Sequence, residues 1–488
     1  MVVPKFNISG GRTMFKKGLT AILTLCTVFA MTACNEEKAA TNTNGANFDT
    51  NIAFDEYYDG ELSSERYDGY EFRILMRKGG ASDQYLEEDS ENLVESATYK
   101  RNKLVENKYG ISITATEASG DCQTDALSSI LAGDDAYDLI FTHSRAAFTY
   151  AVQGAAYNVN DIENIHLDMP WWSKDLRNSC DVNGYLYVLD GDITVQGLGC
   201  SMALFFNKKI FDELGFDYPY EMVKDGEWTF DEFAYLAKKG GADLNGNGTI
   251  EPEYDRFGFV SSDWDAPINM LYAGGQKIYD KNGEGFLELS LYTNKTVDIF
   301  DEFYSLMSNE ACFIIPTEGE NKYKGSNIFS SGRAMMFASL LSTSIDYRSM
   351  DDDFGIIPYP KFDEDDEYTT AINGTAHLAI IPITVTDVER TGAIVEALCA
   401  YGSREVIPAF YEVTLKTKAA RDDESEEMMD IIKDSIIYDI GYVSGGTLQS
   451  VGRDLYIRNA DFASYYAQNE SAALKKLETF NKEYGHMN

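Results

Sequence analysis

Glu71-Phe-Arg-Ile-Leu-Met-Arg77 begins the stretch that decides the fold, and Tyr137-Asp-Leu-Ile-Phe-Thr142 ends it. The first segment alternates apolar and polar residues, which is the period of a β-strand, and the second is an apolar run typical of a buried strand. Between them, residues 92–109 and 125–131 have the spacing of helices, and residues 111–116 alternate again. This order of strand, helix, strand, helix and strand predicts an α/β domain with a parallel sheet that is covered by helices.

The rest of the chain continues the same alternation. Apolar runs predict strands at 185–189, 201–206, 256–260, 334–337, 354–357 and 377–381, and helical spacing predicts helices at 208–214, 294–307, 386–401 and 470–484. A chain of 488 residues is too long for a single core and suits two domains.

The N-terminus has the order of a secretion signal. Basic residues precede an apolar run at 19–31, which is too short to span a bilayer and ends in Met31-Thr-Ala-Cys34. These last four residues resemble the bacterial lipobox, in which the cysteine is acylated and the chain is cut just before it. Residues 1–33 are therefore a predicted signal peptide, Cys34 is the predicted lipid attachment site, and the polar segment 34–62 is a predicted flexible tether. The alternative is an ordinary signal peptide that is cut at the same point without acylation.

The charge of the chain excludes some partners. Asp and Glu number 80 against 41 Lys and Arg, which gives a net charge of −39. Such a field repels nucleic acid and bare anionic surfaces, although a local basic pocket can still bind a small anion. No apolar stretch after Cys34 reaches the length of a membrane span, so the remainder of the chain is expected to be soluble.

The cysteines form no recognisable framework. Seven are present, of which Cys26 lies in the signal and Cys34 is the anchor. The others have no C-x-x-C pair, which excludes a disulfide scaffold and a structural zinc site. They are Cys122, Cys180, Cys200, Cys312 and Cys399. A Cys180–Cys200 bridge across one short segment stays open, but lone buried thiols are the favoured expectation.

Six phrases along the chain carry a resemblance to a known family. In order they are Asn107-Lys-Tyr-Gly-Ile-Ser-Ile113, Tyr137-Asp-Leu-Ile-Phe141, Leu204-Phe-Phe-Asn-Lys-Lys-Ile-Phe-Asp-Glu-Leu-Gly215, Trp228-Thr-Phe-Asp-Glu-Phe233, Phe329-x-x-Gly-Arg-Ala-Met-Met336 and Phe354-Gly-Ile-Ile-Pro-Tyr-Pro360. Together, behind a lipobox, they resemble the extracellular solute-binding proteins of ABC importers, the family that includes maltose-binding protein. Pro170-Trp-Trp172, Asn183-Gly-Tyr-Leu-Tyr187 and Gly191-Asp-Ile193 are similar to phrases of the Gram-positive lipoproteins in that family.

The resemblance implies a type II periplasmic-binding-protein-like fold, in which crossing segments join two α/β lobes and the ligand lies in the cleft between them. It assigns residues 63–190 and 320–375 to lobe 1 and residues 191–319 and 376–488 to lobe 2, with crossings near 190–200 and 320–375. The lobes would close over the ligand about a hinge and present it to the permease of an ABC importer. The expected ligand is a carbohydrate, an oligosaccharide first, and the protein would be lipid-anchored to the outer face of the cell membrane.

The predicted ligand contacts follow from what a sugar requires. A pyranose binds flat aromatic faces, and its hydroxyl groups pair with carboxylates, amides and other polar groups. Under the resemblance, such side chains gather at the first crossing, after the strand 256–260 and in a glycine turn before a later strand. They are Trp171, Trp172, Asp190, Asp192, Asp263, Trp264, Asp265 and Arg333. The alternative for each tryptophan is packing at a lobe surface.

No catalytic motif is present in the sequence. It contains no G-x-S-x-G, no H-E-x-x-H and no P-loop, and its four histidines are scattered, so an enzyme is not expected. The paired carboxylates of a glycosidase cannot be identified in a chain with 80 acids. The alternatives to a sugar binder are a binder of peptides or other polar solutes, a surface glycoside hydrolase, and a structural or sensory lipoprotein.

Asp243-Leu-Asn-Gly-Asn-Gly-Thr-Ile-Glu251 has the oxygen spacing of a calcium-binding loop, with glycine at the sixth position. Tyr254 stands where such a loop has its last acid, so Asp255 would have to complete the shell. A structural calcium ion is one expectation and an Asx-rich turn is the other. No further cofactor is expected. The candidate ligands are Asp243, Asn245, Asn247, Thr249, Glu251 and Asp255.

If this loop binds calcium, a chelator should lower the melting temperature of the calcium-loaded protein, because an ion that binds only the folded state stabilises it. The variant Asp243→Asn, which removes one charged ligand, should then respond less to the chelator. A melting temperature that does not change on chelation would contradict the calcium expectation.

Overall fold

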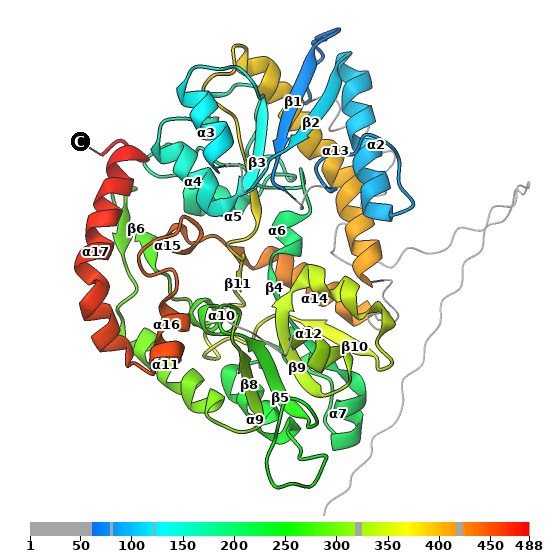
Figure 1. Cartoon of the computed structure of the whole chain (residues 1–488), viewed down its shortest axis with the longest axis vertical. Coiled ribbons are helices and arrows are strands. Elements are labelled where there is room, and N and C mark those ends of the chain that lie inside the picture. The colour runs from blue at the N-terminus through cyan, green and yellow to red at the C-terminus, as the bar shows by residue number, and fades with distance from the viewer. Residues whose placement is uncertain (1–60, 79–81, 121–122, 318–324, 416–422, 488) are drawn as a thin grey trace, which may run out of the picture. The chain divides into compact units, whose positions relative to one another are not determined.

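The computed structural model describes residues 61–78, 82–120, 123–317, 325–415 and 423–487 (Figure 1). The predicted signal peptide, Cys34, Cys122 and nearly all of the predicted tether lie outside these residues, so what was expected of them stays a prediction. Within the described residues, no helix is both long and apolar enough to cross a membrane.

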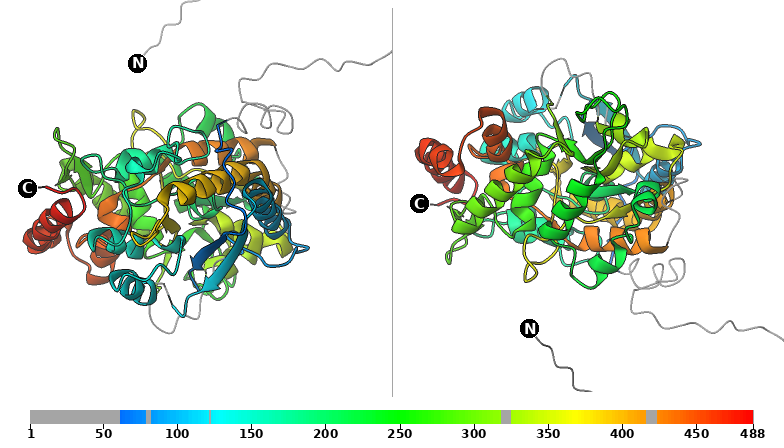
Figure 2. Two further views of the ribbon diagram at one scale, coloured as in Figure 1. Left: turned by 90° about the horizontal axis from the view of Figure 1, so that it is seen from above. Right: turned by 90° about the horizontal axis from the view of Figure 1, so that it is seen from below.

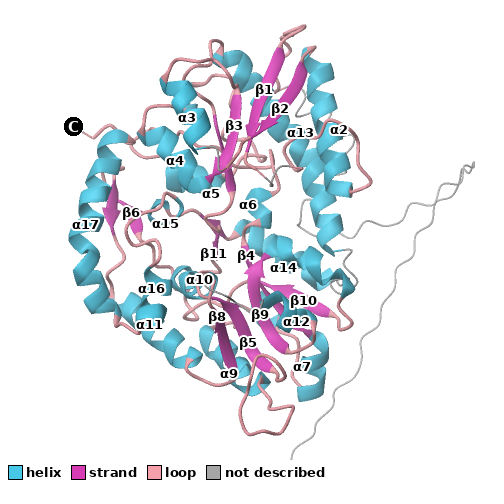
Figure 3. Cartoon of the chain, viewed as in Figure 1, coloured by secondary structure: helices cyan, strands magenta, loops and turns pink. Residues whose placement is uncertain are grey.

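The stretch that decides the fold contributes β1, β2 and β3 to a four-stranded sheet, the first sheet (Figure 3). Its strands are β1 (Glu71–Met76), β2 (Ser112–Glu117), β3 (Leu139–His143) and β12 (His377–Ile380), in the order β12-β3-β1-β2. β1 pairs in parallel with β2 and β3, and β12 pairs antiparallel with β3 at the edge. The predicted α/β organisation is confirmed here.

Helices cover this first sheet. Asn92 begins α2 (Leu93–Tyr109) by accepting hydrogen bonds from the backbone N–H groups of Val94 and Glu95, and Gly110 ends it with a φ of 72°, a value that favours glycine. α13 lies beside α2, as Figure 2 also shows. The bounds of the other helices are Gln123–Leu131 for α3, Ser144–Val152 for α4, Lys174–Cys180 for α5 and Val388–Leu415 for α13.

The middle of the chain forms a five-stranded sheet, the second sheet, in the order β10-β4-β9-β5-β8. β5 is parallel to β8 and β9, whereas β4 is antiparallel to β9 and β10. The strands are β4 (Met202–Asn207), β5 (Phe257–Ser262), β8 (Cys312–Ile315), β9 (Ala334–Leu340) and β10 (Phe354–Ile357). The associated helices are α7 (Lys208–Leu214), α9 (Phe230–Gly240), α10 (Asp265–Ala273), α11 (Asn294–Met307) and α12 (Gly325–Ser330).

The strand pairing differs from the predicted division of the chain. Residues 320–375 were expected with the first sheet, but β9 and β10 pair inside the second. Residues 376–488 were expected with the second sheet, but β12 pairs with β3 of the first, and α13 lies beside α2. The physical reason is that β10 and β12 are both short and fully buried, so nothing in their own sequence identifies the sheet that each one joins.

The segments that carry the chain from the first sheet to β4 and back to β12 lie against one another. The outgoing segment follows Leu189, which bridges Ala379 of β12, and reaches β4 through Ser201, which bridges Ile372. The returning segment contains β11 (Thr370–Ala371), and this strand pairs with β13 (Ile436–Ile437). The largest cluster of buried apolar side chains contains residues of both sheets, including Ile140 of β3 and Phe205 of β4. The core is therefore continuous across these segments.

The C-terminal region adds further helices, and Figure 1 shows α17, which ends the chain, beside α11 and α16. Their bounds are Asp423–Asp434 for α14, Ile440–Val443 for α15, Val451–Arg458 for α16 and Phe462–Glu483 for α17. The described cysteines are buried and unpaired, as expected for lone thiols, and Cys180 does not bridge to Cys200. They are Cys180, Cys200, Cys312 and Cys399.

The outgoing segment begins with a buried acid. Asp190 is 3% exposed, the Tyr438 hydroxyl donates to its Oδ2, and its Oδ1 has no hydrogen-bond partner among the described residues. A Cβ on Gly197 would come within 2.5 Å of Oδ2, so the backbone encloses this carboxyl closely. Burial raises the pKa of Asp190 to about 7, although the Tyr438 hydroxyl and the Gly191 N–H partly offset it.

Because the folded state holds the Asp190 proton more tightly than the unfolded chain does, stability should fall as the pH rises from about 4 to about 7. Asp190→Asn keeps an acceptor for the Tyr438 hydroxyl and cannot ionise. In this variant the free energy of unfolding should therefore fall less steeply with pH, by about 1.4 kcal/mol per pH unit where Asp190 alone titrates. Asp439, whose pKa burial raises to about 6, adds a dependence of the same sign that this variant leaves in place.

Denaturant unfolding at several pH values measures this effect. The exposed Asp217→Asn is the matched control, and it should unfold with the pH dependence of the parent protein. Equal pH dependences for the parent and Asp190→Asn would contradict the prediction.

Candidate functional site

Two cavities lie beside the segments that join the sheets. The larger, of about 410 Å³, is lined by side chains from residues 170–178, 190–198 and 433–438. The smaller, of about 310 Å³, is lined by residues at or just beyond the ends of β3, β5 and β8 and by residues of 373–375 and 442–449. The two cavities share no lining residue, so they are two separate candidates for a binding site.

The smaller cavity lies where the fold favours ligand binding, whereas the larger one does not. His143 is the last residue of β3 in the first sheet, and Ser262 is the last residue of β5 in the second sheet. Ligands of α/β proteins bind beyond the carboxyl ends of strands, where the following loops converge. Both sheets therefore contribute to this cavity at the end of the strand where binding is expected, and we call it the strand-end cavity.

One wall of the strand-end cavity comes from the second sheet. Asp265 accepts hydrogen bonds from Ser262 Oγ at 2.6 Å and from Asn373 Nδ2 at 2.9 Å. Trp264 is half-buried, and the Arg453 guanidinium lies over its ring at 5.1 Å from the centroid. Burial raises the pKa of Asp265, and the two hydrogen bonds partly offset this effect. This wall presents an aromatic ring beside a carboxylate and an amide.

Asp263 supports this wall from behind. Its Oδ1 accepts from Thr317 Oγ1 at 2.7 Å, and its Oδ2 pairs with Arg453 Nε at 3.2 Å. Because Asp263 is fully buried, an ion pair with Arg453 is needed to compensate its charge. Asp263 thus holds Arg453 in place over Trp264 and does not itself line the cavity.

The opposite wall comes from the first sheet and the C-terminal helices. His143 begins α4 by accepting at Nδ1 from the Arg145 backbone N–H. The Arg145 side chain is exposed and donates from Nη2 to Gln449 Oε1 at 3.0 Å. Tyr442 of α15 adds a second aromatic ring to the lining. A ring on each wall, an acid, two amides and an arginine form the combination that recognises a polar ligand with apolar faces.

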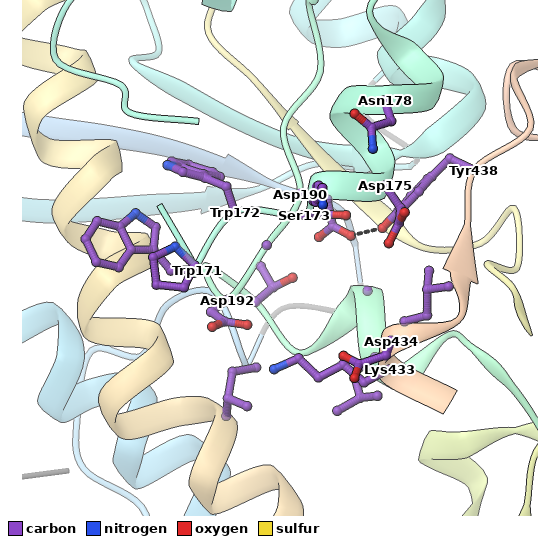
Figure 4. Close-up of a pocket in the computed structure, with 18 residues that line it drawn as sticks. Trp171, Trp172, Ser173, Asp175, Asn178, Asp190, Asp192, Lys433, Asp434 and Tyr438 are labelled. Carbon is purple, nitrogen blue, oxygen red and sulfur yellow. Dashed lines mark hydrogen bonds between the residues drawn. The ribbon is translucent and has the colours of Figure 1, made fainter. Parts of the chain in front are cut away.

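The larger cavity contains four of the predicted contacts (Figure 4). Trp171 and Trp172 are 1% and 5% exposed, and both indole N–H groups donate to Glu396 of α13, at 3.0 and 2.8 Å. Figure 4 shows the two rings beside that helix, with Asp192 near Trp171, whereas Asp190 lies nearer Ser173, Asp175 and Tyr438. The tryptophan rings therefore pack in the interior and offer little free face to a ligand.

Arg333 is separated from the other predicted contacts. It precedes β9 and donates from Nη1 to the Pro252 carbonyl at 2.6 Å, and its own carbonyl accepts from the Phe257 N–H at the start of β5. β5 and β9 are parallel, so Arg333 lies at their amino ends, whereas the strand-end cavity lies at the carboxyl end of β5. Arg333 lines neither cavity.

The calcium-like loop is held by its own hydrogen bonds. Asp255 accepts from the N–H groups of Leu244, Asn245 and Glu251, and Asp243 accepts from those of Gly246 and Gly248. In the part of the chain that the structure describes, no group of three or more His, Cys, Asp or Glu side chains is placed to hold a metal ion. Calcium binding by this loop stays a prediction.

Sequence reasoning missed most of the first-sheet wall. His143 and Arg145 directly follow the buried strand predicted at 137–142, so the rule of strand ends could have found them. Asn373, Tyr442 and Gln449 come from distant loops and helices, and no local pattern marks them. Trp264 and Asp265 are the predicted contacts that the structure does bring to this cavity.

Comparisons with known proteins agree with the fold. A search among curated proteins finds no match. The maltose/maltodextrin-binding domain MalE from Bdellovibrio bacteriovorus, bound to maltotriose, is 16% identical, with 84% of this chain and 100% of that one covered and a TM-score of 0.52. The ABC substrate-binding protein Lmo0181 from Listeria monocytogenes, in complex with cycloalternan, is 13% identical, with 86% and 100% covered and a TM-score of 0.54.

A third similar structure binds a different kind of molecule. It is UgpB from Mycobacterium tuberculosis in complex with glycerophosphocholine, at 14% identity, with 84% and 99% covered and a TM-score of 0.56. At these identities the similarity shows the fold, which is the type II periplasmic-binding-protein-like fold. The family model for bacterial extracellular solute-binding proteins matches residues 90–382, more than half of the sequence. The chain therefore belongs to the bacterial extracellular solute-binding protein family.

Proposed function

We propose that the protein captures an oligosaccharide in the strand-end cavity and delivers it to the permease of an ABC importer. The observation that carries the proposal is the composition of that cavity, in which the half-buried Trp264 ring stands beside Asp265, Asn373 and Gln449, and the more buried Tyr442 completes the lining. Aromatic rings suit the apolar faces of a pyranose, and the amides and the carboxylate suit its hydroxyl groups. Similar structures that hold maltotriose and cycloalternan support the ligand class.

The two walls belong to different sheets, which supports capture by hinge closure. A ligand that touches both walls binds the closed arrangement more tightly than the open one, and this difference in affinity drives the closure. We place the hinge in the outgoing and returning segments, which run between the sheets and bridge one another at Ser201 and Ile372, next to Asn373 of the cavity lining. The lobes themselves retain their internal strand pairing during such a motion.

The proposal also includes the cellular location of the protein. The secretion signal and the lipobox at Cys34 support a location outside the cell, with the chain anchored to the outer face of the membrane. Labelling with a fatty acid tests this point, since a Cys34→Ser variant should lose the label.

A binder of another polar solute is the main rival, and the glycerophosphocholine complex of a similar structure gives it a specific basis. A surface glycoside hydrolase is the rival from another class. The hydrolase would convert a saccharide, whereas a binding protein returns it unchanged. Chromatography of the saccharide after incubation with the protein distinguishes the two.

We expect the melting temperature of the purified protein to rise with at least one saccharide in a panel of sugars, amino acids and peptides. A ligand at one hundred times its dissociation constant stabilises the folded state by about 2.7 kcal/mol. Trp264→Ala should weaken the binding by about 2 kcal/mol, roughly thirtyfold, because it removes an aromatic face from the cavity.

Two control variants locate the site. Tyr254→Ala removes an aromatic ring that is 62% exposed and lines neither cavity, and Asp175→Asn alters the larger cavity, so both should bind as the parent does. A loss of affinity in Asp175→Asn but not in Trp264→Ala would move the site to the larger cavity. Stabilisation by a peptide or another solute, with no response to any sugar, would overturn the ligand class.

A further inference from the structure

The strand-end cavity is bordered by positive charge that no carboxylate of the described residues neutralises. Arg145 lines it, Arg77 donates from Nη1 to the Thr375 carbonyl in its lining at 3.3 Å, and Lys476 donates to the Gly445 carbonyl. None of these three cations forms an ion pair within the described part of the chain. The whole chain has 80 acids and 41 bases, so the sign of this local group of charges is opposite to that of the net charge.

These cations lie close enough to affect their neighbours. A Cβ on Gly445, whose φ is 77°, would come within 2.8 Å of Arg145 Nε, so Arg145 packs against the loop that accepts from Lys476. Burial and Arg145 lower the pKa of Lys476, and Arg77 adds to the burial that lowers the pKa of His377 to about 4. Arg145 and Lys476 therefore place two positive charges near one another on the first-sheet wall.

The carboxylates of the opposite wall already have hydrogen-bond or ion-pair partners within the protein. Both oxygens of Asp265 accept hydrogen bonds from neutral groups, and the two oxygens of Asp263 are used by Thr317 and Arg453. Asp263 thus neutralises Arg453 and leaves Arg145 without a counterion. Arg145 uses one donor, for the neutral Gln449, and its other N–H groups have no hydrogen-bond partner among the described residues.

From this arrangement we propose that the saccharide bound in the strand-end cavity is acidic, and that Arg145 is the residue that recognises its anionic group. A guanidinium pairs with a carboxylate through two parallel hydrogen bonds, and such charge-assisted bonds are stronger than those to a hydroxyl group. A uronate carboxylate and a sulfate ester offer the same chemistry. This inference rests on the proposed function and narrows its ligand class.

The test compares saccharides that differ only in charge. Binding of the purified protein is measured with matched pairs of equal length and linkage, such as a galactose disaccharide against the galacturonate disaccharide, with glucose and mannose pairs and a sulfated disaccharide as further arms. We expect at least one acidic member to bind about tenfold or more tightly than its neutral partner. Its affinity should also fall as the salt concentration rises.

The variant Arg145→Gln should lose most of that preference for the acidic member. Arg66→Gln is the matched control, because Arg66 is an arginine outside the cavity that is paired with Asp68, and it should retain the preference. Response to the uronates alone or to the sulfated sugar alone identifies the anionic group.

The outcomes separate this inference from the proposed function. Equal or tighter binding of the neutral members, with no effect of Arg145→Gln on the ratio, would overturn the acidic ligand and leave the oligosaccharide binder standing. An unchanged preference in Arg145→Gln would overturn the role of Arg145. Absence of binding by any saccharide, neutral or acidic, would overturn the proposed function and this inference together.

Discussion

The rest of the structure depends on the path of the chain, which leaves the first sheet, forms the second sheet and then returns to the first. The chain leaves the first sheet after Leu189 and returns to it in β12, where Leu189 and Ala379 exchange two backbone hydrogen bonds of 2.9 Å. On the way, Ser201 bridges Ile372, so the outgoing and returning segments lie side by side. As a result, β3 and β5 end at one cavity although they belong to different sheets.

Local structure was easier to predict from the sequence than the partners of each segment. Alternation and helix ends are local properties, so β1, α2 and β3 follow from their own residues, and Trp264 and Asp265 could be placed after a strand. The pairing of β12 with β3 has no local signal. The environment of Trp171 likewise depends on Glu396, which is 225 residues away in the sequence. Large aromatic side chains next to a crossing therefore suggested a ligand platform where the fold uses them in the core.

The buried acidic groups near the joining segments are accommodated in three different ways. Asp263 is paired with Arg453, Asp265 accepts from neutral donors, and Asp190 is buried where its proton is retained up to about neutral pH. Each solution satisfies the requirement that a buried charge be paired, hydrogen-bonded or neutralised. The first-sheet wall is different because Arg145 has no counterion among the described residues. In a strongly acidic protein, a cavity with this wall can attract a small anion that the rest of the surface repels.

The central claim is that one ligand contacts both sheets in the cavity between β3 and β5. Hydrogen exchange of backbone amides, with and without a saturating saccharide, tests it most directly because it reports on each segment separately. The account predicts new protection at 143–145 beside the first sheet and at 262–265 and 373–375 on the opposite wall, with none at 173–178. Protection confined to one sheet, or to the segments around the larger cavity, would contradict it.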